Sequence, residues 1–355
     1  MPKRHLRNMS LEQLRTYIID HGVPEFRFRQ VAKWVYIKLA HNFSEMTDLS
    51  KSFRETLDSE AVVEALRPLD ARISKLDGTK KFLFELPDGE TVESVLMRQE
   101  KRITLCISTQ VGCPLDCVFC HTGQGAYKRN LSAGEILDQI CILKRECLPE
   151  AEKVNIVFMG MGEPLLNFNH LTNAIGVLND PLGLNTGSKR ITVSTAGLPD
   201  RIIELADAGL KCSLAISLNA PTDAKRRRLM PALSGFSISE ILDAARYFHR
   251  KTRRRVTLEY VLLDGENTSK RDALALAKLS AGGPFKINLI PYNPGRGPKF
   301  EGISEPTLNR FVQTLLPIAP AVMIRRSRGA DIDAACGQLW TESLDAKKKP
   351  PAGVG

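Results

Sequence analysis

Residues 113–121 read CPLDCVFCH, and this short stretch holds three cysteines, Cys113, Cys117 and Cys120, in the spacing CxxxCxxC. Its last five residues, CVFCH, also match CxxCH, the pattern of covalent haem attachment. A zinc ion, a haem and an iron–sulfur cluster are therefore the three centres to consider.

The number of cysteines distinguishes a zinc site from an iron–sulfur cluster. A structural zinc site normally has four Cys or His ligands and commonly pairs two CxxC knuckles. The chain has no second knuckle, and His121 would have to turn back onto the centre that its neighbour Cys120 already binds. A cubane iron–sulfur cluster has four irons that each need an outside ligand, so three cysteines would leave one iron open to a substrate.

Targeting signals are missing from the sequence. The N-terminal stretch MPKRHLRNMSLEQLRTYIID contains no apolar run, and no segment approaches the ~18 to 20 apolar residues of a membrane span. We therefore expect a cytoplasmic protein without membrane association. Disulfides are rare in that compartment, so the eight cysteines are better explained by metal binding, catalysis or burial. A c-type haem would require export, which argues against the haem interpretation.

The chain is basic, with 50 Lys plus Arg against 40 Asp plus Glu and a formal net charge of +10. An excess of this size favours a polyanionic partner. The positive charge gathers in four runs, at residues 225–228, 250–255, 325–328 and 347–349. Solvated helix ends would explain any single run, but four together favour RNA or DNA as the partner.

A chain of 355 residues is long enough for two or three structural units. Residues 1–62 are predicted to form a small basic helical domain. Ser10 and Gln13 have the spacing of a capping box, and apolar residues then recur at helical spacing.

In the next segment the spacing of apolar residues changes from a helical to a strand-like period. Residues 63–100 alternate in polarity and carry two turn signals, DG at 77–78 and PDG at 87–89, which predicts an antiparallel β linker. At the other end of the chain, residues 341–355 are expected to form a disordered basic tail.

Residues 101–340 alternate between strand-like and helix-like segments, which predicts an α/β domain with a parallel sheet. The strand candidates are the apolar segments 102–108, 154–160, 190–195, 212–218, 254–263, 286–292 and 321–327. An open doubly wound sheet and a partial barrel both fit this pattern. In either fold, ligands bind at the carboxyl ends of the strands.

Glycines and polar residues follow several of these strand candidates. The second candidate ends in MGMGEP, whose glycines permit close backbone approach to a ligand and whose Glu163 places a carboxylate at the strand end. Later candidates end in Ser194, Ser217, Asn219 and Asn293. Together these side chains could line a pocket for a polar cofactor, although loop hydrogen bonding explains each one singly.

The spacing CxxxCxxC after the first strand and GEP after the second resemble the radical S-adenosylmethionine (SAM) superfamily. The longer blocks FRFRQVAKWVYIK, FMGMGEPLLN, ITVSTAG, AISLNAP, KINLIPYNP and RGADIDAACGQL are similar to the radical SAM methyltransferases of RNA adenosine. That family includes the 23S rRNA adenine carbon-2 methyltransferases (RlmN type), some of which also act on tRNA, and related carbon-8 methyltransferases. The resemblance implies a partial (β/α)6-type radical SAM barrel with a small helical N-terminal domain and a short β-hairpin linker.

The resemblance also implies roles for individual residues. Cys113, Cys117 and Cys120 would hold a [4Fe–4S] cluster whose open iron binds the amino and carboxylate groups of SAM. The residues at the family's SAM-contacting positions are Gly162, Glu163, Ser194, Ser217, Leu218, Asn219 and Asn293. The family often has His where this chain has Asn219, and Asn can still hydrogen-bond a ribose hydroxyl.

Two further cysteines have mechanistic roles in the family. Cys336 would accept a methyl group from one SAM, and a radical derived from a second SAM would activate that methyl group for addition to the adenine carbon. Cys106 would then release the product through a transient disulfide with Cys336, and Glu93 would serve as a supporting proton acceptor. Each turnover would therefore use two SAM molecules.

The partners implied are 23S rRNA, tRNA as a second substrate, and a low-potential electron donor such as a flavodoxin system, with the enzyme acting as a monomer. Two alternatives stay open at this point. One is methylation of carbon 8 in place of carbon 2. The other is a non-catalytic RNA-binding protein whose cysteines hold structural zinc, which would leave Cys106, Cys336 and the polar strand ends unexplained.

Overall fold

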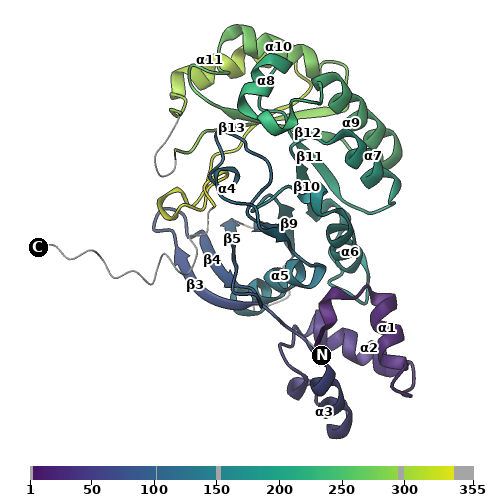
Figure 1. The fold of residues 1–355 in the computed structure, drawn as a ribbon. Coiled ribbons are helices and arrows are strands. Elements are labelled where there is room, and N and C mark those ends of the chain that lie inside the picture. The colour runs from purple at the N-terminus through teal and green to yellow at the C-terminus, as the bar shows by residue number, and fades with distance from the viewer. Residues whose placement is uncertain (1–2, 101, 149–152, 295–299, 340–355) are drawn as a thin grey trace, which may run out of the picture.

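A ten-stranded sheet forms the centre of the molecule in the computed structural model, which describes residues 3–100, 102–148, 153–294 and 300–339 (Figure 1). In spatial order its strands are β14 (Val322–Ile324), β13 (Phe285–Pro291), β12 (Val256–Leu262), β11 (Ser213–Ser217), β10 (Ile191–Thr195), β9 (Val154–Phe158), β6 (Arg102–Cys106), β5 (Thr91–Gln99), β4 (Lys80–Glu85) and β3 (Arg67–Ile73). Strands β6 and β9 through β14 pair in parallel, so the α/β partial barrel expected from the sequence is confirmed.

Helices lie on the outside of the parallel strands (Figure 1). They are α5 (Ala133–Cys147), α6 (Phe168–Asn179), α7 (Pro199–Asp207), α9 (Ile238–Thr252), α10 (Lys270–Ser280) and α11 (Glu305–Leu315), with the short α4 (His121–Gln124) and α8 (Asp223–Leu229) in loops. Helix α5 begins at the Ser132–Glu135 capping box and α9 at the Ser237–Glu240 box, and both boxes have the sequence spacing of such a motif. None of the helices among the described residues is long and apolar enough to cross a membrane.

The antiparallel strands β3, β4 and β5 extend the barrel sheet directly, since β5 pairs with β6 in the register Val95↔Cys106. The two turn signals lie beside these strands, and Gly78 and Gly89 there have φ of 70° and 84°, which a glycine adopts without steric cost. The segment that the sequence indicated as a linker is therefore continuous with the barrel sheet. The predicted tail, residues 341–355, lies outside the described residues.

The N-terminal unit contains α1 (Leu11–Ile19), α2 (Phe26–Ala32), a π-helical segment (Lys33–Ile37) and α3 (Lys51–Glu60). Helix α1 begins at Ser10, and the capping box with Gln13 is present. A short parallel pair of β1 (Arg4–His5) and β2 (Ala61–Val62) closes the unit at its two ends. This unit packs beside α5 of the barrel (Figure 1).

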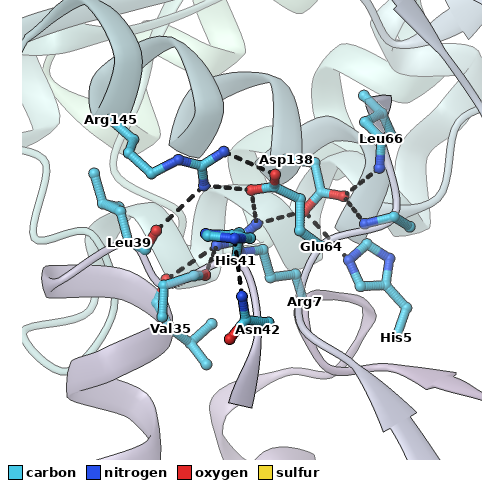
Figure 2. Close-up of polar contacts among 12 residues, drawn as sticks. His5, Arg7, Val35, Leu39, His41, Asn42, Glu64, Leu66, Asp138 and Arg145 are labelled. Atoms are coloured by element: carbon cyan, nitrogen blue, oxygen red, sulfur yellow. Dashed lines mark hydrogen bonds and ion pairs between the residues drawn. The ribbon is translucent and has the colours of Figure 1, made fainter. Parts of the chain in front are cut away.

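A buried ionic network joins the N-terminal unit to α5 (Figure 2). Arg7 is fully buried, donating from Nη1 to Asp138 Oδ1 at 2.7 Å and from Nη2 to the carbonyls of Val35 and Ala40 at 3.3 and 3.0 Å. His5 Nε2 donates to the same carboxylate oxygen at 3.2 Å. The second oxygen of Asp138 accepts from the backbone N–H groups of residues 65 and 66 at 2.7 and 3.1 Å.

A second carboxylate completes this network. Glu64 accepts two hydrogen bonds from Arg145, at 2.6 and 2.8 Å, and lies 3.3 Å from Arg7. Buried charges are tolerated where each is paired and hydrogen-bonded, and Asp138 meets both conditions. Burial alone would raise the pKa of Asp138, but the positive charges of His5 and Arg7 and their hydrogen bonds hold that pKa well below its usual range.

Replacing Asp138 with Asn should therefore destabilise the protein strongly. The substitution leaves Arg7 buried without its main counter-charge and turns an amide N–H₂ toward backbone donors. We expect the free energy of unfolding, measured by urea denaturation, to fall by about 3–5 kcal/mol. The Asp243→Asn variant, which removes an exposed pairing with Arg246 in α9, should leave the urea midpoint unchanged.

The same network sets a pH dependence. Because the folded pKa of Asp138 is depressed, its stabilisation is complete above the ordinary Asp pKa of about 3.9 and is lost as pH falls through the folded pKa. The stability gap between wild type and Asp138→Asn should narrow below about pH 4. A gap that stays constant down to pH 2 would contradict this assignment.

Candidate functional site

A cavity opens at the carboxyl ends of the parallel strands and brings together residues from most of the barrel. Of the residues predicted from the sequence, those lining it are Cys113, Cys117, Cys120, Gly162, Glu163, Ser194, Ser217, Asn219, Asn293 and Cys336. Three predicted residues, Glu93, Cys106 and Leu218, are buried and do not line it. The strand-end location that the sequence predicted is thus where the structure places the cavity.

The three-cysteine loop follows β7 (Gln110–Val111), a short strand paired with β8 (Arg129–Asn130). Gly112 at its start has φ of 75°, and a Cβ there would lie 2.3 Å from the carbonyl oxygen of Ala126, so only glycine fits. The backbone N–H of Val118 donates to the carbonyl of Leu229 at 3.0 Å, and that of His121 donates to the carbonyl of Gly337 at 2.8 Å. The loop is therefore anchored both to α8 and to the segment that carries Cys336.

The thiols of this loop are suited to a metal cluster. Burial raises the pKa of Cys113 to about 12, and burial together with the neighbouring Cys120 and Cys113 thiols raises that of Cys117. Three such thiols facing one cavity would ionise together only with compensating positive charge, which iron supplies. Within the described part of the chain, no three Cys, His, Asp or Glu side chains are placed to hold a single metal ion. A structural zinc site normally has four Cys or His ligands, whereas three thiolates would bind a four-iron cluster and leave one iron open.

Glu163 lies at the end of β9 with its carboxylate directed to the neighbouring strand ends. Its side chain accepts hydrogen bonds from the backbone N–H of Ala196 at 2.7 Å and of Leu165 at 3.0 Å. Burial raises the pKa of Glu163 to about 7, against these hydrogen bonds, which lower it. The preceding Gly162 has φ of 98° and packs against the side chain of Gln110, leaving no room for a Cβ.

Arg226 holds the strand ends from outside the cavity, a role that the sequence did not indicate. Its buried guanidinium donates from Nη1 to the carbonyls of Ser217 and Leu218 at 3.1 and 2.9 Å, and from Nη2 to the carbonyl of Ala196. The loops after β10 and β11 are thereby tied to α8. The sequence placed this arginine in a basic run and gave no sign of its burial.

The remaining SAM-contact candidates differ in how far their polar groups are already engaged. Asn219 has φ of 56°, a left-handed conformation that Asn tolerates, and its Oδ1 accepts from the backbone N–H of Val261 at 3.0 Å. Asn293 donates to Ser327 Oγ and to the carbonyl of Pro291. The Leu218 side chain is fully buried, so only its backbone could contribute to the site.

Cys336 lines the cavity, and the buried Cys106 interacts with it electrostatically. Burial, together with the neighbouring Cys336, raises the pKa of Cys106 to about 12. All eight cysteines are free thiols, so the predicted disulfide between Cys106 and Cys336 is not supported. A disulfide would need the two sulfurs in bonding contact, and the structure holds Cys106 in the wall formed by β6.

Glu93 belongs to β5 and is buried, and its Oε1 lies 3.0 Å from Lys81 Nζ on β4. Residues facing each other across antiparallel strands share one face of the sheet. The register Leu83↔Glu93 and Val95↔Cys106 therefore puts Glu93, Lys81 and Cys106 on the inward face. The described carboxylates that line the cavity are those of Glu163 and Glu259.

Two charged residues of the cavity lining were missed by sequence reasoning. Glu259 on β12 accepts a hydrogen bond from Asn288 Nδ2 at 2.6 Å, and Arg325 after β14 donates to Met159 Sδ at 3.3 Å. The electrostatic attraction of Cys336 raises the pKa of Arg325, against burial, which lowers it. The sequence placed Glu259 in a strand candidate and Arg325 in a basic run, and it did not show which of their side chains would face the inside of the barrel.

The basic runs that suggested a polyanion are largely occupied by internal contacts. Lys225 pairs with Asp272 at 2.7 Å and Arg228 pairs with Glu266 at 2.5 Å. Arg326 pairs with Glu305 at 2.6 Å. The run at 347–349 lies outside the described residues. Within the described ranges, these ion pairs balance part of the positive charge of the runs.

Comparison with known proteins gives two family matches. The Radical SAM superfamily model matches residues 107–277, and the ribosomal RNA large subunit methyltransferase N-terminal domain matches residues 4–63. The second match spans the helical N-terminal unit, and the first lies within the barrel and ends before β13.

Curated relatives are similar over nearly the whole chain. A probable dual-specificity RNA methyltransferase RlmN from Thermotoga maritima is 46% identical over 97% of this chain and 99% of its own length. A dual-specificity RNA methyltransferase RlmN from Geotalea uraniireducens is 44% identical, covering 96% of this chain and 97% of its own. Among solved structures, a radical SAM methyltransferase from Sphaerobacter thermophilus superposes with a TM-score of 0.91 at 40% identity, over 95% of this chain and 99% of that one.

Arg226→Met should destabilise the strand ends, because three buried carbonyls lose their donor. We expect the free energy of unfolding to fall by about 2–4 kcal/mol in urea denaturation. Arg227→Met is the matched control, because Arg227 follows Arg226 in the same helix and is exposed to solvent. This variant should unfold like wild type. Equal stability of the two variants would show that the buried hydrogen bonds contribute little.

Proposed function

The chain belongs to the RlmN family of radical SAM RNA methyltransferases, and from this we propose that it methylates carbon 2 of an adenosine in 23S rRNA, with a tRNA adenosine as a second substrate. One observation carries the proposal: Cys336 lines the same cavity as the three-cysteine loop and the polar strand ends. The rival interpretation, a non-catalytic zinc-binding protein, is not supported, because the full-length relatives are methyltransferases.

We propose that Cys113, Cys117 and Cys120 hold a [4Fe–4S] cluster, leaving one iron free for the amino and carboxylate groups of SAM. When bound, the cluster supplies the electron that cleaves SAM to a 5′-deoxyadenosyl radical. A low-potential donor such as a flavodoxin system would provide that electron. Gly162, Glu163 and the polar strand ends would orient SAM, with Leu218 contributing through its backbone.

Cys336 is proposed as the residue that carries the methyl group. Carbon 2 of adenine is electron-poor, and a methyl cation equivalent would react at a ring nitrogen instead, so a carbon target calls for radical chemistry. The Sγ atom of Cys336 would bond to the methyl carbon of one SAM while the sulfonium bond breaks, and S-adenosylhomocysteine would leave. A second SAM would be spent on activating that methyl group, giving two per turnover.

Cys106 is proposed as the second thiol of the reaction, acting on Cys336 when the product is released. Its location on the inward face of β6, within electrostatic reach of Cys336, supports this role. A proton acceptor is also required, and the carboxylates available on the inward face are Glu93, Glu163 and Glu259.

The RNA partner needs a basic surface, and the N-terminal unit offers one. Arg29, Lys33 and Lys38 are exposed, and within the described ranges none of them has an ion pair within 4 Å. Phe26 and Ile37 on the same helical stretch are each 52% exposed. Exposed cations beside an exposed aromatic ring suit an RNA backbone and its bases.

The function is tested by nucleoside mass spectrometry on an unmodified 23S rRNA fragment, incubated anaerobically with reconstituted protein, SAM and a low-potential reductant. We expect 2-methyladenosine from wild type and none from Cys336→Ala, whose cluster should remain intact by absorption spectroscopy. The alternative, methylation of carbon 8, would appear as 8-methyladenosine and would overturn the assignment of the carbon. An intact cluster with no methylated adenosine on either RNA would overturn the proposed function.

Reversing charge on the N-terminal face should weaken RNA binding. The triple variant Arg29→Glu, Lys33→Glu, Lys38→Glu should bind the same fragment about tenfold or more weakly at moderate salt. The slope of log affinity against log salt should also fall by about one for each phosphate contact removed. Filter binding over a salt series measures both quantities.

A matched triple variant controls for net charge. Arg271 and Lys278 on α10 and Arg310 on α11 are exposed at the end of the molecule opposite the N-terminal unit (Figure 1). Their replacement by Glu changes the net charge equally and should alter affinity much less. Equal losses in the two triple variants would mean that the N-terminal face makes no particular contact.

A further inference from the structure

Cys336 lies in an irregular loop that returns from β14, outside any long helix or strand. Three residues of this loop, Gly329, Asp333 and Gly337, have φ of 65°, 53° and 82°. A left-handed conformation at Asp333 carries a steric cost for an L residue, so the surrounding structure must hold the loop in place. The placement of the Cys336 sulfur thus depends on what anchors the loop.

The anchors come from the hairpin formed by β3 and β4. Asp331 accepts from Ser74 Oγ at 2.7 Å and from the backbone N–H of Lys75 at 2.9 Å. The backbone N–H of Gly329 donates to Asp77 Oδ2 at 3.0 Å. These contacts hold the start of the loop against the hairpin turn, but both lie several residues before Cys336.

Lys81 reaches further along the loop. Its Nζ donates to the carbonyl oxygen of Asp333 at 3.2 Å, three residues before Cys336, and lies 3.0 Å from Glu93 Oε1. Both side chains are nearly buried, with 8% of Lys81 and 7% of Glu93 exposed. A buried ammonium with a carboxylate on one side and a loop carbonyl on the other is fixed in direction.

We propose that Lys81 is a positioning residue for Cys336 and that Glu93 acts through it, by holding the Lys81 ammonium against the carbonyl of Asp333. This inference rests on the proposed function, and it replaces the expectation that Glu93 is a proton acceptor. Glu93 is directed to a lysine on its own sheet, whereas the carboxylates that line the cavity are Glu163 and Glu259.

The two roles for Glu93 act on different steps. A proton acceptor would be needed only after the methyl group has joined the adenine carbon. A positioning pair is needed earlier, when the Cys336 sulfur must meet the methyl group of SAM in line, and misplacement by about 1 Å can cost on the order of a hundredfold in rate. The yield of methylated Cys336 therefore separates the two roles.

The test uses full-length reconstituted protein carrying Lys81→Met, Glu93→Gln, both substitutions together, or Lys81→Arg. The double variant matters because each single change leaves a buried charge without its partner and can unfold the protein. Arg67→Met with Glu85→Gln is the matched control, since this pair joins β3 and β4 at the end of the same hairpin away from its turn, where Arg67 is exposed.

The first readout is the rate at which Cys336 gains one methyl group, followed by peptide mass spectrometry. We expect a roughly tenfold or greater loss in Lys81→Met, in Glu93→Gln and in the double variant alike, because the two residues act as one unit. Lys81→Arg should recover most of the rate, and the control pair should match wild type. RNA methylation should fall in the same proportion, with no build-up of a protein–RNA adduct.

Two outcomes of the methylation assay would overturn the proposal. One is Glu93→Gln protein that methylates Cys336 at the wild-type rate but accumulates a covalent adduct with RNA, which would make Glu93 the proton acceptor. The other is a double variant that methylates Cys336 at the wild-type rate.

A second readout does not depend on the reaction. Amide hydrogen exchange over residues 329–338 should quicken in the double variant and not in the control pair. Faster exchange in the double variant, in a preparation whose wild type methylates no RNA, would uphold the loop anchor while the proposed function failed. If exchange is unchanged in the double variant while wild type methylates RNA, Lys81 does not anchor the loop, and the proposed function still holds.

Discussion

The parallel pairing of β6 with β9 through β14 is the constraint on which the site depends. Parallel strands send all their carboxyl ends to one rim, so residues more than 200 positions apart in sequence, such as Cys113 and Cys336, face one cavity. The rim exposes backbone groups that no further strand can pair. Glu163 accepts from two of its N–H groups and Arg226 donates to three of its carbonyls, so buried charges complete the hydrogen bonding that the sheet leaves open.

Local signals in the sequence predicted most of the fold. The capping boxes at Ser10, Ser132 and Ser237 mark helix starts in the structure, and the apolar strand candidates correspond to β6 and β9 through β14. These features depend on residues a few positions apart, which is why spacing reveals them. The antiparallel segment was also recognised by its turns. The pairing of this segment with β6 was not predicted, because contacts between residues far apart in the sequence decide which strands pair.

The site was predictable to the extent that strand ends can be read from the sequence. Cysteine spacing and the residues after each strand indicated most of the cavity lining, while Glu259 and Arg325 were missed because their inward direction depends on barrel curvature. Charge was the least reliable guide. A run such as KRRR gives the same formal charge whether its members face solvent, pair with Asp272, or, like Arg226, lie buried against carbonyls.

The pairing of Arg7 with Asp138 has a consequence for how the protein is made. The N-terminal unit leaves the ribosome first, but the carboxylate that Arg7 requires lies 131 residues further along the chain. At synthesis rates of about 5–20 residues per second, Arg7 waits roughly 7–26 seconds for its partner. Until then its guanidinium stays hydrated, and the helices around Val35 and Ala40 cannot close over it. Completion of the first helical unit during biosynthesis is therefore timed by the emergence of the barrel's first long helix.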